Sequence, residues 1–154
     1  MGAWISYGLG SENRNLPGFI VLNGGLIPPG GLDNFNSGFL PAAYQGSVFR
    51  AGDPPVANIR PLERDPEQQR AKLDLLRQLD RAALERTGRV DEVESAIVNA
   101  ETAFRMQAAV PELVDLSKEP KSTFDLYGED AKKPATFANV ALTARRLVER
   151  GVRF

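Results

Sequence analysis

The 154-residue sequence contains no cysteine and no histidine. Without thiols the chain cannot form disulfide bonds or use a thiolate nucleophile, and without imidazoles it cannot build a Ser/His catalytic pair. The two absences also remove the nitrogen and sulfur ligands of zinc sites. Carboxylates are therefore the only strong metal ligands left to the chain. The lack of cysteine assigns no compartment, because exported proteins can do without disulfides.

A charge excess and a long apolar run are also missing. The sequence has 19 Lys and Arg residues against 20 Asp and Glu residues, which gives a net charge of -1. A nearly neutral chain lacks the basic surface that binds nucleic acid or anionic membranes. No apolar run approaches the roughly 18 residues that a membrane helix needs. We therefore expect no nucleic-acid partner and no membrane span.

Glycine and proline, by contrast, are crowded into the first 60 residues. This segment holds 11 of the 14 Gly and 6 of the 11 Pro, but only 6 of the 39 charged residues. It also contains aromatic side chains, which are rare in disordered segments. The apolar run FIVLN at residues 19–23 predicts a strand that is covered on both faces. We expect one partial domain over residues 1–154, with a Gly-rich loop and strand segment at 1–60 and a helical segment at 61–154.

The helical segment begins with signals for two long helices. Asp65 can cap the first, Pro66 suits its first helical position, and Gln68 completes a capping box. Gly88 can supply a left-handed stop. The same capping-box spacing recurs three residues after Gly88, at the start of the second helix.

Apolar residues recur at helical spacing in both predicted helices. The stripes are Leu73, Leu76, Leu79 and Ala83 in the first, and Val93, Ile97, Ala100, Phe104 and Ala108 in the second, which starts with Asp91 and Glu94 as its capping pair. Because only a few residues join them, residues 65–110 should form an antiparallel helical hairpin. The many charges of this hairpin are expected to face solvent.

The remainder of the chain predicts short helical turns and one further long helix. Turns are expected at PELVDLS, after Pro111, and at KSTFDLYG, which Gly128 ends. A last helix is expected from about Pro134 to Arg150, with GVRF beginning a parallel strand after it. Its buried face should comprise Phe137, Val140, Ala141, Ala144, Leu147 and Val148, and Arg145 and Arg146 should be solvated.

Four interpretations compete for the glycine-rich opening: a targeting signal, a lipid anchor, a phosphate-binding loop and an interior piece of a longer domain. MGAWISYGLG has no Lys or Arg, which a secretory signal requires. Met1, Gly2 and Ser6 fit the myristoylation pattern, but bulky Trp4 and Ile5 lie inside it. The glycines of GLGSEN lack the last glycine of a dinucleotide fingerprint. We therefore expect an interior piece that starts within a helix and turns into the strand.

Four blocks of the sequence resemble a known family. They are GAWISYGLGSENRNLPGFIVL, NSGFLPAAYQGSVFR, AFRMQAAVPELVDLS and ARRLVERGVRF, in this order over nearly the whole chain. They resemble the sulfatase-like proteins called "domain of unknown function 1501", in the alkaline phosphatase superfamily. The resemblance implies an α/β fold, here a predominantly helical and incomplete piece of an alkaline-phosphatase-like domain with one or two short strands. It also implies a bacterial protein exported through a twin-arginine signal, which this chain lacks.

The resemblance further implies chemistry on phosphate or sulfate esters. In the superfamily two divalent metal ions, held by Asp and His on separate loops, clamp the attacking and leaving oxygens. None of these ligands can be carried over to this sequence, so we expect no cofactor in the chain and no catalytic or metal-binding residue. The chain is expected to be the central fragment of a sulfatase-like hydrolase, inactive by itself.

Although it lacks the metal ligands, a central fragment of such a hydrolase can still contribute residues that contact the substrate. The polar groups in NFNSGFLPAAYQGSVFR suit the hydroxyls and anionic oxygens of a sugar or ester, and they can equally satisfy backbone groups of a long loop. The candidate substrate-binding residues are Asn34, Asn36, Ser37, Tyr44, Gln45 and Arg50. Glu12 and Arg14, in SENRN, are interpreted as a local ion pair.

A second hypothesis belongs to a different class of protein. The chain can be a free-standing, non-catalytic module that binds a ligand or a protein through its glycine-rich loops. If instead it is a fragment, FIVLN and GVRF have lost neighbouring strands, and Trp4 and Phe19 have lost part of their cover. The expected partners are then the missing flanking segments of its own domain, or a second copy of the chain around residues 1–23 and 151–154.

Overall fold

The structure is a computed structural model that describes residues 1–23, 28–50, 52, 54–57, 59–63, 65–88 and 90–154. Within them the chain forms five α-helices, three short 3-10 helices and two strands. In chain order the elements are α1 (Gly2–Leu9), β1 (Ile20–Asn23), η1 (Gly31–Phe35), η2 (Ala42–Tyr44), β2 (Ser47–Arg50), α2 (Pro66–Thr87), α3 (Asp91–Val114), α4 (Lys121–Tyr127), η3 (Glu129–Lys132) and α5 (Phe137–Glu149). The predicted α/β class with predominantly helical content is confirmed.

The two strands pair in parallel, from Ile20 opposite Ser47 to Asn23 opposite Arg50. The end of the chain runs along the other side of β1: the Phe154 N–H donates to the Gly18 carbonyl at 3.0 Å, and the Ile20 N–H donates to the Phe154 carbonyl at 2.9 Å. This is the parallel pairing pattern that we predicted for GVRF. At Ile20 the expected loss of a neighbouring strand is therefore wrong, because backbone hydrogen bonds reach the start of β1 from both sides.

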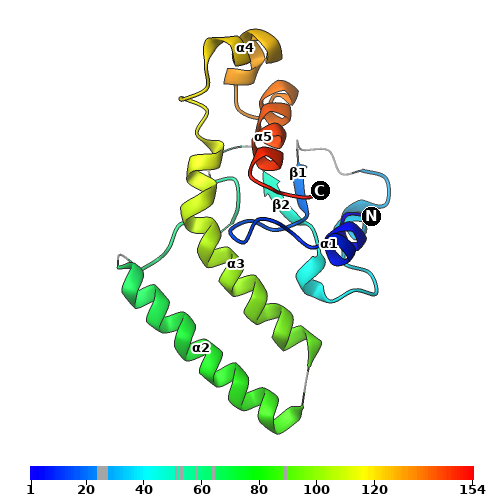
Figure 1. Ribbon diagram of the computed structural model, residues 1–154, viewed down its shortest axis with the longest axis vertical. Helices are drawn as coiled ribbons and strands as arrows, with labels where there is room; N and C mark the ends of the chain where they lie inside the picture. Colours follow the sequence, from blue (N-terminus) through cyan, green and yellow to red (C-terminus); the bar gives the residue numbers. More distant parts are fainter. Residues whose placement is uncertain (24–27, 51, 53, 58, 64, 89) are drawn as a thin grey trace.

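The hydrophobic core lies where the C-terminal half of α3 and the end of α5 meet the strands (Figure 1). Its buried members are Leu16, Ile20, Phe49, Ile59, Met106, Val110, Leu113, Leu147 and Val152. Residues from the beginning, middle and end of the chain thus share one core. The α2–α3 hairpin extends away from this core, and α4 lies at the opposite end of the molecule (Figure 1).

The start of α1 packs closely against the Phe19 and Phe154 rings. A Cβ atom on Gly2 would lie 2.6 Å from Phe154 Cδ1 and 2.7 Å from Phe19 Cδ2, so only glycine fits this contact. The Phe19 and Phe154 rings meet edge to face at 5.4 Å. Phe19 is therefore buried, and our expectation that it lacks cover is wrong; Trp4, in contrast, is 58% exposed.

The predicted helical hairpin is present as α2 and α3, and Asp65 caps α2 as predicted. The Asp65 carboxylate accepts a hydrogen bond from the Glu67 N–H at 2.9 Å, and Gly88 follows α2 with φ 78°. At α3, however, the predicted N-cap residue is wrong by one position. Val90 is the N-cap residue, without a side-chain hydrogen bond, and Asp91 is the first helical residue.

The predicted apolar stripes are out of phase with the buried faces. Leu76 and Leu79 are exposed on α2. The buried residues of α3 are Ser95, Glu101, Met106, Val110 and Leu113 rather than the predicted set. The reason is electrostatic, because Arg70 and Arg77 of α2 turn toward the buried Glu101 carboxylate and set the rotation of the helix.

Two boundaries and one buried face of the last third also differ from prediction. The helix α3 continues through Pro111 to Val114, because Val110 and Leu113, both fully buried, hold this turn against the core. The last helix starts at Phe137, after the Thr136 cap, rather than at Pro134. Phe137 and Val148 of its predicted buried face are exposed, at 88% and 67%, because the helix turns Leu142, Arg146 and Leu147 inward instead. None of the described helices combines the length and the apolar character needed to cross a membrane.

Candidate functional site

The six predicted binding residues do not converge on one site. Asn34 Nδ2 donates to the carbonyls of Pro29 and Gly31, at 2.9 and 3.1 Å, and Asn36 Nδ2 donates to Asp33 Oδ1 at 3.1 Å. These two side chains therefore brace the loop around η1. The other four line three separate hollows: Ser37 beside α3, Tyr44 and Gln45 near the amino ends of the strands, and Arg50 at their carboxyl ends.

The cavity at the carboxyl ends of the strands has a volume of about 220 Å³. Its apolar walls are Leu22, Phe49, Pro55, Val114, Pro134 and Val140, and its polar groups come from Asn23, Arg50, Asn139 and Thr143. An apolar hollow with a few convergent polar groups is the usual form of a small-ligand site, and pockets for drug-sized ligands run from about 300 to 1,000 Å³. This smaller cavity, which we call the carboxyl-edge cavity, suits a small group.

Parallel pairing explains why Asn23 and Arg50 meet at this cavity. They are the last residues of β1 and β2 and are register partners. Both strands therefore deliver a polar side chain to the same edge of the sheet. In open α/β sheets ligands bind outside the carboxyl ends of the strands.

The opposite wall comes from the first turns of α5. Thr136 caps this helix by accepting a hydrogen bond from the Asn139 N–H at 3.2 Å. Asn139 Nδ2 donates to the Ala131 carbonyl at 2.9 Å, and the Thr143 hydroxyl donates to the Asn139 carbonyl at 2.9 Å. The Asn139 amide therefore keeps a second N–H donor for a ligand, whereas the Thr143 hydroxyl has used its only proton and can only accept.

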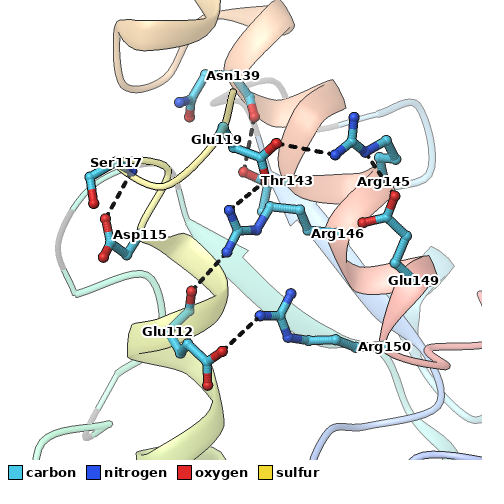
Figure 2. Close-up of polar contacts among 10 residues, drawn as sticks. All are labelled: Glu112, Asp115, Ser117, Glu119, Asn139, Thr143, Arg145, Arg146, Glu149 and Arg150. Carbon is cyan, nitrogen blue, oxygen red and sulfur yellow. Dashed lines mark hydrogen bonds and ion pairs between the residues drawn. The ribbon is translucent and has the colours of Figure 1, made fainter. Parts of the chain in front are cut away.

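A cluster of ion pairs holds α5 against the end of α3 (Figure 2). Arg146, only 7% exposed, donates to Glu119 Oε1 at 2.7 Å and to the Glu112 carbonyl at 3.0 Å. Arg145 donates to Glu119 Oε2 at 3.2 Å, and Arg150 donates to Glu112 Oε1 at 3.3 Å. The expectation that Arg145 and Arg146 are solvated is wrong, because Glu119 draws both guanidinium groups to the interface. The cluster fixes the wall that carries Asn139 and Thr143.

The turn after α3 is stabilised by a second carboxylate. Asp115 Oδ1 accepts a hydrogen bond from the Ser117 N–H at 2.9 Å (Figure 2). Hydrogen bonds from Ser117 lower the pKa of the Asp115 carboxyl below its ordinary value. The ionised form is thus favoured where the chain leaves α3 for the Glu119 linker.

The charge of the carboxyl-edge cavity selects for anions. Among the described residues that line it, Arg50 is the one ionised side chain, and none is a carboxylate. Its guanidinium group presents donors in a planar fork that matches carboxylate, phosphate and sulfate oxygens. The free N–H of the Asn139 amide can donate a further hydrogen bond to such a group.

The residues present do not fit the two-metal centre that the resemblance implies. The sequence offers no His or Cys, and in the described parts of the chain no three Asp or Glu side chains lie close enough to share an ion. Two metal ions require several ligands each. The donor set of the cavity, one guanidinium with amide and hydroxyl groups, instead suits the direct binding of an anion.

Comparison with known proteins identifies one family. The profile described as "Protein of unknown function (DUF1501)" matches residues 1–154. No curated protein and no solved structure matches the chain.

Proposed function

This chain belongs to the DUF1501 family, and we propose that it forms the anion-binding wall of a sulfatase-like ester hydrolase with an alkaline-phosphatase-like fold. In this proposal the carboxyl-edge cavity receives the phosphate or sulfate group of the ester. Arg50 pairs with the anionic oxygens, and Asn139 contributes a hydrogen bond from the second N–H of its side-chain amide on α5. Export from a bacterial cell is part of the same proposal, because the resemblance implies it.

One observation carries the proposal. Arg50 lines the cavity at the carboxyl ends of two parallel strands, and the described residues of that lining include no carboxylate. Leu22 and Phe49 are apolar residues of the cavity that Arg50 lines. An ion pair beside apolar groups is screened less than one in open solvent. The site therefore favours a compact, doubly charged group over chloride.

The proposed role for this chain is binding without turnover. Its donor set does not fit a metal centre, so neither the nucleophile nor the leaving group of an ester would be activated by a metal ion held by these residues. We expect the chain to release no p-nitrophenol from p-nitrophenyl phosphate or sulfate above a mock preparation, with Mg²⁺, Mn²⁺ or Zn²⁺ added. Turnover that a chelator abolishes would contradict this role.

Binding itself is tested by titrating inorganic sulfate and phosphate against the ¹⁵N-labelled chain at constant ionic strength, with chloride as the reference salt. We expect saturable shifts at the amides of Asn23, Arg50, Asn139 and Thr143. Arg50→Gln should weaken binding at least about tenfold, since a charge-assisted hydrogen bond contributes about 1.5–3 kcal/mol.

The matched control is Arg81→Gln, which removes a charge from the exposed face of α2 and should leave binding unchanged. Equal weakening in both variants would indicate a general charge effect. Undiminished binding in Arg50→Gln, or shifts confined to another part of the chain, would overturn the assignment of the site.

A further inference from the structure

A larger groove lies at the other end of the strands. It has a volume of about 680 Å³ and runs between α1, η2, the amino ends of β1 and β2, and the middle of α3. Its lining includes Phe19 and Ser47 at the starts of the strands, whereas the carboxyl-edge cavity is lined by their last residues. The groove is therefore a separate site, and we call it the tyrosine groove after Tyr7 and Tyr44.

Two tyrosine rings line this groove, and the Trp4 ring lies against one of them. Tyr7 and Tyr44 meet edge to face at 5.2 Å, and Trp4 meets Tyr7 in the same way at 6.5 Å. Trp4 and Tyr7 are 58% and 53% exposed. Perpendicular rings leave at least one face of each ring uncovered by the other. An aromatic face carries negative charge density and attracts the polarised C–H groups of a sugar ring.

Two side-chain amides without a partner among the described residues also line the groove. Gln45 and Asn99 line the groove and are exposed, and among the described residues no side-chain hydrogen bond ties either of them to the protein. An amide both donates and accepts, as does a sugar hydroxyl. Asn13 and Thr102, also in the lining, are already hydrogen-bonded to the backbone, to Arg150 and Val98 respectively, and shape the floor instead.

The charge of the groove is positive. Arg14 and Arg105 are the ionised side chains of its described lining, which includes no carboxylate. Arg105 is held in place, since it donates to the Arg14 carbonyl at 2.8 Å and lies 3.6 Å from Glu101 Oε2. The local ion pair that we expected between Glu12 and Arg14 is wrong, because Glu12 Oε1 pairs with Arg153 at 3.2 Å. The Arg14 side chain is exposed, and no ion pair engages it in the described structure. An anionic group in the groove would find its partner there.

We infer that the tyrosine groove binds an acidic saccharide. Tyr7 and Tyr44 stack on the sugar rings, Gln45 and Asn99 pair with hydroxyls, and Arg14 pairs with a carboxylate or other anionic substituent. The groove lies at the end of the strands opposite the carboxyl-edge cavity, so this inference does not depend on the proposed ester-binding role.

The single tryptophan of the chain, Trp4, reports on the groove because its ring lies beside Tyr7. We expect trigalacturonate to change the Trp4 fluorescence saturably, at a protein concentration where sedimentation shows one species. Maltotriose, the neutral reference, should bind at least about fivefold more weakly. Arg14→Gln should remove this preference, because it leaves the stacking and the amides in place.

Tyr44→Ala should weaken trigalacturonate binding about fivefold or more, as loss of one aromatic contact predicts. Tyr127→Ala, on α4, is the matched control and should bind as the unmodified chain does. If Tyr44→Ala fails to fold by circular dichroism, Gln45→Ala, at an exposed position, replaces it with the same expectation. No saturable change with either saccharide, or equal binding in the groove variant and the control, would overturn the inference.

Arg50→Gln separates the two sites. It should leave saccharide binding unchanged while it weakens sulfate binding. Loss of saccharide binding in this variant would place the saccharide in the carboxyl-edge cavity and contradict the groove assignment.

Discussion

At the scale of single residues, burial of polar groups decides which side chains organise the molecule. Arg146 is almost inaccessible yet donates to both Glu119 and the Glu112 carbonyl, so its charge is compensated. Arg146 links α5 to the end of α3 and thereby positions the polar side chains that α5 contributes to the carboxyl-edge cavity. Arg50, by contrast, is exposed, and its guanidinium N–H groups can bind a ligand.

Ser6 is the opposite case. Its hydroxyl is buried in α1, with 6% of the residue exposed, and it has no hydrogen-bond partner in the described structure. Ser6→Ala removes an uncompensated polar group and inserts a better helix former. We expect the free energy of unfolding to rise by about 1 kcal/mol, measured by urea denaturation.

Ser122→Ala, at an exposed position of α4, is the control for Ser6→Ala and should change stability by less than about 0.5 kcal/mol. A loss of stability in Ser6→Ala would mean that its hydroxyl forms a hydrogen bond in solution.

At the scale of elements, the α2–α3 hairpin is held by charge more than by leucine packing. Glu101 of α3 is buried and pairs with Arg77, Arg70 and Arg105, the last two at 3.6 Å. Leu75, Leu76 and Leu79 of α2 remain exposed. The hairpin should therefore be sensitive to removal of the single carboxylate that three guanidinium groups share.

Glu101→Gln keeps the size of the side chain and removes its charge. We expect the free energy of unfolding to fall by about 2 kcal/mol, because the three guanidinium groups lose their common partner. Amide exchange in α2 should accelerate more than exchange in β1.

Glu85→Gln, on the exposed face of α2, serves as the control for Glu101→Gln. If the two variants unfold at the same denaturant concentration, the ion pairs of Glu101 do not stabilise the hairpin.

At the scale of the whole molecule, apolar surface is concentrated around α1. Met1, Trp4, Tyr7 and Leu9 are all more than half exposed, whereas Phe19 beneath them is buried. Exposed apolar patches of several hundred Å² commonly mark association surfaces. These exposed residues belong to the segment 1–23, for which we expected contact with flanking segments or with a second copy of the chain.

Sedimentation of a concentrated sample should therefore show a species heavier than the 16.8 kDa monomer. Trp4→Ser should shift it toward monomer, because it removes the largest exposed ring of α1. Phe137→Ser, at a position of α5 that is 88% exposed, should leave it unchanged. A single monomeric species at every concentration would contradict self-association through α1.

The candidate sites were only partly predictable from sequence. Arg50 was among the predicted binding residues and lines the carboxyl-edge cavity, and Tyr44 and Gln45 line the tyrosine groove. Asn139 and Thr143 were missed. Their spacing of four residues places them on one face of α5, but no local pattern relates that face to strands about 90 to 120 residues earlier.

The sequence by itself determined the helical class, the positions of the hairpin helices and their ends at Asp65 and Gly88. These features depend on hydrogen bonds and backbone angles between near neighbours, which residue type dictates. The tertiary structure alone decided which helical faces are buried, why α3 passes through Pro111, and which polar groups share a cavity. Burial depends on contacts between residues that are distant in the chain. Glu101 pairs with Arg77 of α2, where periodicity predicted a leucine stripe, and Glu119 pairs with Arg146, which was expected to face solvent.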